Sequence, residues 1–274
     1  MGQTTNNNIE NNTLKILSIQ ISLNGLSFCV KENNQVIVIK QDNFGISLNP
    51  EQVLNKIKYT FQHDETLKGD FSSIEVIYQN DLYTIVPKSL FNENSVKEYL
   101  KYNIKILEND FVAYDEIHQH DIVSVYIPYA NINNFFFENF GSFTYKHSST
   151  ILINNLATRE KNNNTPIVFA NINQKYFDLI IIKKGKLVLL NTYKYETKED
   201  FLYYVMFATE QLKLNPEKFT LKFIGDLTKD SDLYTIAYKY IRNIEFEKAS
   251  DSVHISPNLS NFEPHQHFVL LSHF

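Results

Sequence analysis

Histidine side chains are the groups in this sequence whose spacing most resembles a metal site. His118 and His120 alternate among acidic residues, and His265 and His267 alternate near the C-terminus. Alternating residues of a strand share one face, so each pair offers half of a tetrahedral Zn²⁺ site. Neither pair has two further ligands at a recognisable spacing, and Cys29 is the single cysteine. We therefore expect no metal: the first pair fits a turn between strands, and the second a partly ordered tail.

A second candidate combines His147 with Ser148 and Ser149, which offer a nucleophile and a base. No Gly-x-Ser-x-Gly elbow surrounds them. Serine before an apolar helical stretch is typical of helix N-caps, so we expect these serines to cap the helix that follows. Cys29 lies in an apolar run, which favours a buried thiol over a nucleophile.

The composition limits the classes of protein that fit. The chain has 274 residues, of which 43% are hydrophobic, so it can bury a large core. A net charge of -5 argues against a general nucleic-acid partner. No apolar run reaches the roughly 18 residues of a membrane span. Residues 1–13 lack the pattern of a signal peptide. We expect them to be a disordered tail on a cytoplasmic protein.

Two stretches of the chain show the same order of expected elements. From Leu14 to Tyr78 we expect three strands, a helix capped by Asn49, and a fourth strand. From Pro166 to Gly225 we expect the same order, with Thr197 as the cap. The strands and turns agree at an offset of about 151 residues, which indicates a duplicated fold. The pairs that share this offset are Ile21 and Ile172, Phe28 and Leu179, Asn34 and Gly185, and Phe44 and Tyr195.

The duplication predicts the organisation of the chain. The expected units are a first lobe at 14–160 with an inserted α+β subdomain at about 80–145, a second lobe at 166–249, and a C-terminal extension at 250–274. The extension ends in an apolar run, Phe268 to Leu271. We expect this run to be a last strand or a segment docked on a partner.

Two copies of a β-β-β-α-β unit resemble the ground plan of the actin, sugar kinase and heat-shock chaperone superfamily. This is a duplicated, ribonuclease-H-like α/β fold. The chain looks most like the bacterial branch of cell-division and pilus-assembly proteins, which carry an inserted subdomain in the first half. A closer resemblance, to a Bacteroidetes family labelled domain of unknown function 3822 and associated with an actin-like ATPase fold, rests on four phrases. They are Tyr83 to Pro87, Tyr126 to Asn133, Glu199 to Tyr204, and His265 to Phe268.

The resemblance implies where a nucleotide would bind. An Asp-x-Gly pattern after the first strand of the superfamily organises Mg²⁺ and phosphate, and Gln20 and Ser22 match it here. An Asp-x-Gly-Gly-Gly pattern in the second half is matched by Asn171 and Asn173. The glycine pair that holds adenosine keeps only Gly225. An amide does not neutralise charge around Mg²⁺-phosphate as a carboxylate does, so we expect neither ATP nor Mg²⁺ as a cofactor.

These patterns predict a catalytically inactive protein of actin-like fold that binds another protein, or itself as a homodimer. The enzyme alternative is an ATPase or phosphotransferase with unusual loops. It requires at least two carboxylates near Ser22 and Asn173, and a ring plugging the cleft would exclude it. The candidate carboxylates are Asp42, Asp178 and Asp226, and the candidate plugs are Tyr176 and Phe177.

A third hypothesis is a binder of a small ligand in the cleft between the lobes. Gln20 and Asn171 would supply its polar contacts. Lys175 could meet a phosphate, but a solvated lysine in a turn is the better interpretation.

Overall fold

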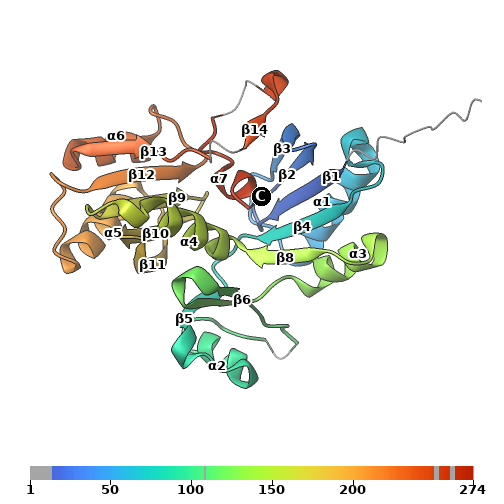
Figure 1. The fold of residues 1–274 in the computed structure, drawn as a ribbon, viewed down its shortest axis with the longest axis horizontal. Coiled ribbons are helices and arrows are strands. Elements are labelled where there is room, and N and C mark those ends of the chain that lie inside the picture. Colours follow the sequence, from blue (N-terminus) through green and yellow to red (C-terminus); the bar gives the residue numbers. More distant parts are fainter. Residues whose placement is uncertain (1–13, 108, 250–252, 260–262, 274) are drawn as a thin grey trace, which may run out of the picture.

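The first lobe is built on a six-stranded sheet, of which the four strands nearest the N-terminus are drawn in blue to cyan in Figure 1. The computed structural model describes residues 14–107, 109–249, 253–259 and 263–273, so the expected tail at 1–13 lies outside the described residues. The strand order is β14-β3-β2-β1-β4-β8. The strands are β1 (Lys15–Ile21), β2 (Gly25–Glu32), β3 (Gln35–Asn43), β4 (Ser73–Tyr78), β8 (Thr144–His147) and β14 (His254–Ile255).

Local signals explain the start of this lobe. Asn33 and Asn34 both adopt positive φ, at 47° and 68°, as the two-residue turn between β2 and β3 requires. Helix α1 (Pro50–His63) begins with a capping box in which Asn49 and Gln52 satisfy each other's backbone amides. Helix α3 (Ala130–Phe140) lies against α1 and buries Ile132 and Phe136 in the same core.

The second lobe repeats this plan around a five-stranded sheet of order β11-β10-β9-β12-β13. Helix α5 (Lys198–Gln211) has a capping box formed by Thr197 and Asp200, and α6 (Asp232–Tyr240) packs beside it. Phe201 and Ala237 bring the two helices onto one face of the sheet. The strands are β9 (Ile167–Ile172), β10 (Tyr176–Lys183), β11 (Lys186–Lys194), β12 (Thr220–Gly225) and β13 (Asn243–Phe246).

The duplication extends to an irregularity in each lobe. The β2–β3 pairing skips Ile37, and the β10–β11 pairing skips Val188, so each hairpin carries a β-bulge. These two residues keep the expected offset, since 188 minus 37 is 151. The turn residues Lys184 and Gly185 have positive φ, as Asn33 and Asn34 do. The shared bulge and turn confirm a duplicated fold.

A third sheet of order β5-β7-β6 stands apart from both lobes, at the bottom of Figure 1. Its own core includes Val86 and Val123 together with Leu100 of a short helix. Helix α3 falls within the range expected for the insertion, yet its buried residues belong to the core of the first lobe. The elements here are β5 (Tyr83–Pro87), α2 (Val96–Leu100), β6 (Ala113–Ile117) and β7 (Ile122–Tyr126).

Two helices lie between the lobes and share one apolar core with both large sheets. They are α4 (Ser148–Arg159) and α7 (Phe268–Leu271). The closing apolar run is thus a short helix packed inside its own chain, which corrects the expectation of a strand or of a segment docked on a partner. Cys29 faces this core with no exposed surface, and burial raises the pKa of its thiol to about 12, so it is not a nucleophile.

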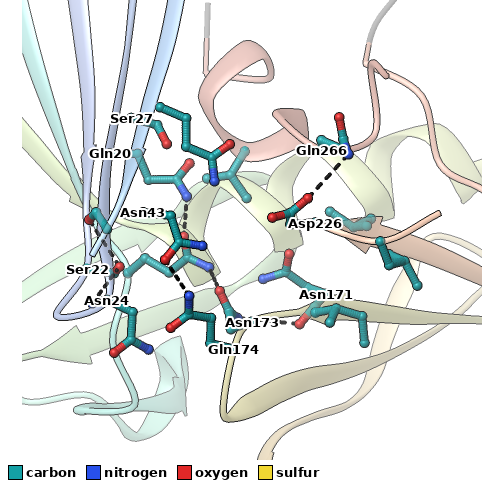
Figure 2. A pocket seen from close by; sticks show the side chains of 18 of the residues that line it. Gln20, Ser22, Asn24, Ser27, Asn43, Asn171, Asn173, Gln174, Asp226 and Gln266 are labelled. Atoms are coloured by element: carbon teal, nitrogen blue, oxygen red, sulfur yellow. Dashed lines mark hydrogen bonds between the residues drawn. The ribbon is translucent and has the colours of Figure 1, made fainter. Parts of the chain in front are cut away.

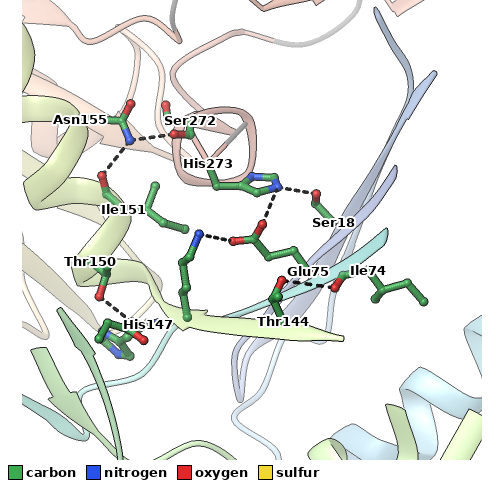
Figure 3. Close-up of polar contacts among 12 residues, drawn as sticks. Ser18, Ile74, Glu75, Thr144, His147, Thr150, Ile151, Asn155, Ser272 and His273 are labelled. Atoms are coloured by element: carbon green, nitrogen blue, oxygen red, sulfur yellow. Dashed lines mark hydrogen bonds and ion pairs between the residues drawn. The ribbon is translucent and has the colours of Figure 1, made fainter. Parts of the chain in front are cut away.

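Polar contacts hold the C-terminal segment in place, as Figure 3 shows. His273 Nε2 lies 2.5 Å from Ser18 Oγ and 3.7 Å from a carboxylate oxygen of Glu75. Asn155 of α4 donates a 2.7 Å hydrogen bond to the carbonyl of Ser272. The C-terminal segment therefore ties α4 to the sheet of the first lobe. Among the described residues, no helix has the length and apolar character needed to cross a membrane.

Candidate functional site

A cavity of about 220 Å³ lies between the lobes, where β1 and β9 end (Figure 2). The structure brings all five residues of the predicted nucleotide site to its wall. They are Gln20, Ser22, Asn171, Asn173 and Gly225. Within the second sheet β9 and β12 pair in parallel, so Gly225 lies at the same edge as Asn171 and Asn173 although it is distant in sequence.

Side-chain amides join the two lobes across this cavity. Gln20 Nε2 donates to Gln79 Oε1, and Gln79 Nε2 donates to Asn173 Oδ1. A second bridge runs from Gln174 Nε2 to Asn43 Oδ1 at 2.5 Å. We call these contacts the amide ladder, and Figure 2 shows it as dashed lines between the ends of the two sheets. The ladder joins Gln20, near the end of β1, to Asn173 in the loop that follows β9, and both positions match the phosphate patterns.

The first loop uses its polar groups to close its own turn. The backbone amide of Ser22 donates to the carbonyl of Gly25 at 3.0 Å, and Ser22 Oγ donates to the same carbonyl at 3.2 Å. Asn24 N donates to Ser22 Oγ at 3.2 Å. Asn24 and Gly25 therefore form the predicted turn, and the serine hydroxyl serves that turn.

The second loop rests on a buried carboxylate. Asn171 Nδ2 donates to Asp178 Oδ2 at 2.9 Å, and Thr192 Oγ1 donates to Oδ1 of the same carboxylate at 2.6 Å. Burial raises the pKa of Asp178 to about 6, although these two hydrogen bonds oppose the rise. Asn171 is 1% exposed. Its side-chain amide therefore stabilises the loop through Asp178 and presents almost no surface to the cavity.

The charge of the cavity is low. Among the described residues that line it, Asp226 is the one carboxylate, and none is lysine or arginine. Asp226 accepts a 3.3 Å hydrogen bond from Gln266. Asp42, Asp178 and Lys175 do not line the cavity. The two carboxylates that the enzyme alternative requires are not brought together here.

Of the two rings considered as plugs, Tyr176 lines the cavity, whereas Phe177 is fully buried in the core of the second lobe. The Tyr195 hydroxyl donates to the carbonyl of Asn173 at 2.7 Å and so fixes the second loop from one side.

Steric crowding and backbone conformation both require glycine at position 225. Its φ is +98°, and a Cβ at this position would lie 2.3 Å from the carbonyl oxygen of Ile172. Its amide donates to the carbonyl of His265 at 3.0 Å. The glycine therefore permits three segments to meet at the cavity, whether or not a ligand binds there.

Neither histidine pair gathers further ligands. His118 and His120 occupy a 3₁₀ turn between β6 and β7, and His118 pairs with Glu116 at 3.3 Å. His265 Nε2 lies 2.8 Å from the carbonyl of Leu227. Within the part of the chain that the structure describes, no three His, Cys, Asp or Glu side chains are grouped to hold a metal ion.

The serine and histidine candidates lie in the interior. His147 Nδ1 accepts the Ser149 amide at 3.1 Å, so His147 itself caps α4, and the serines begin the helix. This corrects the expectation that a serine would be the cap. Ser149 Oγ lies 2.7 Å from His147 Nδ1, and both residues are at most 2% exposed. Burial lowers the pKa of His147 to about 3. No substrate has access to this pair.

The sequence reasoning missed Gln79, and it did not single out Gln174, although Gln174 lies in the stretch matched to the second phosphate pattern. Gln79 directly follows β4, which pairs in parallel with β1 in the register Ile21 to Tyr78. The rule that adjacent parallel strands end at the same edge would have placed Gln79 beside Gln20.

The family model described as "Protein of unknown function (DUF3822)" matches residues 4–244. The chain belongs to this family. No curated protein matches it. The family predicted from four short sequence segments is therefore confirmed.

This DUF3822 chain shares its fold with solved structures. A Bacteroides thetaiotaomicron protein with actin-like ATPase fold and unknown function superposes with a TM-score of 0.76 at 21% identity. The match covers 86% of this chain and 91% of that one. A type IV pilus biogenesis complex, PilM-PilN, gives a TM-score of 0.61 at 12% identity over 94% of this chain and 96% of that one. At these identities the likeness shows the actin-like fold alone, which confirms the predicted fold class.

Proposed function

We propose that this protein is a catalytically inactive member of the actin-like fold that acts by binding another protein. The amide ladder carries the proposal. Gln20, Gln79 and Asn173 bond to one another at the position where the superfamily resemblance places Mg²⁺ and phosphate. A nucleotide would have to break these contacts and separate the loop tips.

The chemistry of the cavity favours the same conclusion. Mg²⁺ prefers carboxylate and water oxygens, and phosphoryl transfer depends on cations that stabilise developing negative charge. The described lining offers Asp226 as its carboxylate and no lysine or arginine. At about 220 Å³ the cavity is also below the roughly 300–1,000 Å³ typical of ligand pockets.

A protein-binding role is supported by the retained architecture. Two lobes, a separate three-stranded sheet and an interlobe core are maintained without the phosphate chemistry. PilM, which shares this fold, is described in complex with PilN. We propose that this chain likewise binds a protein partner, in the cytoplasm, and a homodimer is the alternative arrangement.

Phosphate release from Mg²⁺-ATP tests the proposal. The purified protein should release no more phosphate than buffer does. Asp226→Asn is the matched variant, because it removes the cavity's carboxylate with little change in shape. Turnover by the unmodified protein that Asp226→Asn abolishes would refute the proposal, because a contaminating ATPase would survive the substitution.

A neutral small ligand is the second candidate, favoured by the polar lining of the cavity, in which amide and hydroxyl side chains outnumber the single described carboxylate, Asp226. Mass spectrometry of the small molecules released on denaturing the protein tests it. A molecule that co-purifies with the unmodified protein but not with Asn173→Leu supports the ligand hypothesis. Equal recovery from both proteins counts against it.

A further inference from the structure

The equivalent edge strands of the two large sheets, β3 and β11, differ in whether a further strand pairs with them. In the first lobe β14 lies alongside the outer edge of β3, with His254 opposite Gln35 and Ile255 opposite Val36. The offset of 151 residues places Lys186 and Leu187 of β11 at the equivalent edge of the second lobe. The second sheet ends at β11, and no described strand pairs with this edge.

The contact in the first lobe shows what such an edge can bind. The segment around β14 is extended and pairs in parallel with β3. Ser256 N donates to the Val36 carbonyl at 2.9 Å. Ile255 and Val253 also pack against the interlobe core. An edge with this turn and bulge therefore accepts a short strand through its backbone and through alternate apolar side chains.

The edge of β11 faces a groove of about 1,020 Å³. One wall is the run Leu187 to Leu190, in which the bulge residue Val188 is 45% exposed. The opposite wall comes from the three-stranded sheet, through Ile85 and Ile122. The wall also contains His120, whose Nε2 is buried without a hydrogen-bond partner.

Alternate residues of β11 direct their backbone groups away from β10, toward the open edge of the sheet. Tyr195 N donates to the Lys175 carbonyl. From this pair to the bulge, the two strands keep one register, in which Leu190 lies opposite Ile180. In an antiparallel pair, alternate residues direct their backbone groups toward the partner strand. Residue 195 points toward β10, so Leu190 points away from it. A strand added at this edge would find an unpaired amide and carbonyl there.

Charge indicates what kind of strand would fit. Lys161, Lys184 and Lys186 line the groove and are exposed, whereas Asp121 is the one carboxylate among the described residues of its wall. This basic rim occurs on a chain whose net charge is -5. Electrostatic complementarity therefore favours an acidic partner.

We propose that β11 receives an extended segment of a partner protein, which alternates apolar and acidic side chains and adds to the sheet as a parallel strand. This inference rests on the proposed protein-binding function and names its surface. Main-chain hydrogen bonds would supply affinity, and the apolar walls and lysine rim would supply specificity. The alternative is that the bulge and lysines merely keep an exposed edge unpaired.

Fluorescence anisotropy with a defined probe tests the proposal. The probe is a labelled peptide of about eight residues that alternates valine and glutamate. A second peptide of the same sequence is N-methylated at alternate residues. The methyl groups remove the backbone N–H donors that would face β11. The chain is tested unmodified, as Lys161→Glu/Lys186→Glu, and as Lys218→Glu/Lys229→Glu. The last pair is the control, since it changes the net charge equally at exposed positions outside the groove.

The proposal expects the plain peptide to bind, and N-methylation to weaken binding at least ~10-fold. The groove variant should lose at least ~10-fold, and the control should stay within ~2-fold. Amide hydrogen exchange should slow at residues 186–190 on binding. Absence of binding at ~1 mM peptide, equal binding of the N-methylated peptide, or equal loss in the control would each overturn it. ATP turnover would instead refute the proposed function and leave this peptide result standing.

Discussion

The side-chain amide of Gln79, at the end of β4 in the first lobe, donates a hydrogen bond to Oδ1 of Asn173 in the second. Gln79 also accepts from Gln20, so one residue joins both matched loops. Gln79 is 6% exposed, which shields these bonds from water. The lobes are thus joined at the mouth of the cleft as well as through the core beneath it.

Replacing Gln79 tests the strength of this contact. Gln79→Ala removes two part-buried hydrogen bonds, and it should lower the free energy of unfolding by about 1–3 kcal/mol. Urea unfolding measures the change. Gln41→Ala is the control, because Gln41 lines the same cavity but is exposed and outside the ladder. Equal effects of the two substitutions would show that the ladder contributes no stability of its own.

Asp178 should make the protein less stable as pH rises from about 4 to 6. Its pKa is raised from 3.8 to about 6, so the folded state holds a proton that the unfolded state has released. The free energy of unfolding should therefore fall by about 2 kcal/mol between pH 4 and pH 6. Asp178→Asn should remove that slope. Parallel stability curves for variant and unmodified protein between pH 4 and pH 6 would contradict the assignment.

His147 should act in the opposite sense. Burial lowers its pKa from 6.5 to about 3, so the unfolded state gains a proton first as the pH falls. The contribution of His147 to the free energy of unfolding is fully present above about pH 6.5. Below that pH, it falls by up to ~1.4 kcal/mol per pH unit. His147→Asn keeps a capping side chain and removes the titration. Denaturant unfolding between pH 7 and pH 5 should show a flatter profile for this variant, and an unchanged slope would argue against a buried neutral histidine.

Gly225→Ala should destabilise the protein strongly, because its Cβ would meet the Ile172 carbonyl at 2.3 Å. We expect a loss of about 3 kcal/mol or more. Gly141→Ala is the matched control: Gly141 also has positive φ, at +71°, but nothing lies within 4 Å of its Cβ position. It should cost only ~1–2 kcal/mol of backbone strain. Thermal unfolding of both variants gives the comparison. Equal losses of stability would show that the close approach at Gly225 adds nothing to the cost of backbone strain.

The core of each lobe could be predicted because its signals are local. Asn49 and Gln52 are three positions apart, as are Thr197 and Asp200, and both pairs form capping boxes. The turn at Asn33 likewise depends on nearby residues. These features follow from backbone chemistry and do not depend on distant partners.

What could not be predicted depends on distant partners. β8 is four residues of mixed polarity, and it is a strand because it pairs with β4, at Tyr145 opposite Val76. α7 is a helix four residues long that forms between two sheets already in place. The five site residues were found through family resemblance, but their contacts were not. Gln79 belongs to no matched pattern, and Gln174 replaces a glycine of the second pattern, which says nothing of its contact with Asn43.

Thermal unfolding with and without Mg²⁺-ATP tests the central claim most directly. A ligand at about 100 times its dissociation constant stabilises the native state by roughly 2.7 kcal/mol, which would raise the unfolding temperature by several degrees. The amide ladder and the low charge of the cavity predict no shift at millimolar nucleotide. A reproducible rise, absent in Asp226→Asn, would show that the cleft opens to bind Mg²⁺-nucleotide and would contradict the account.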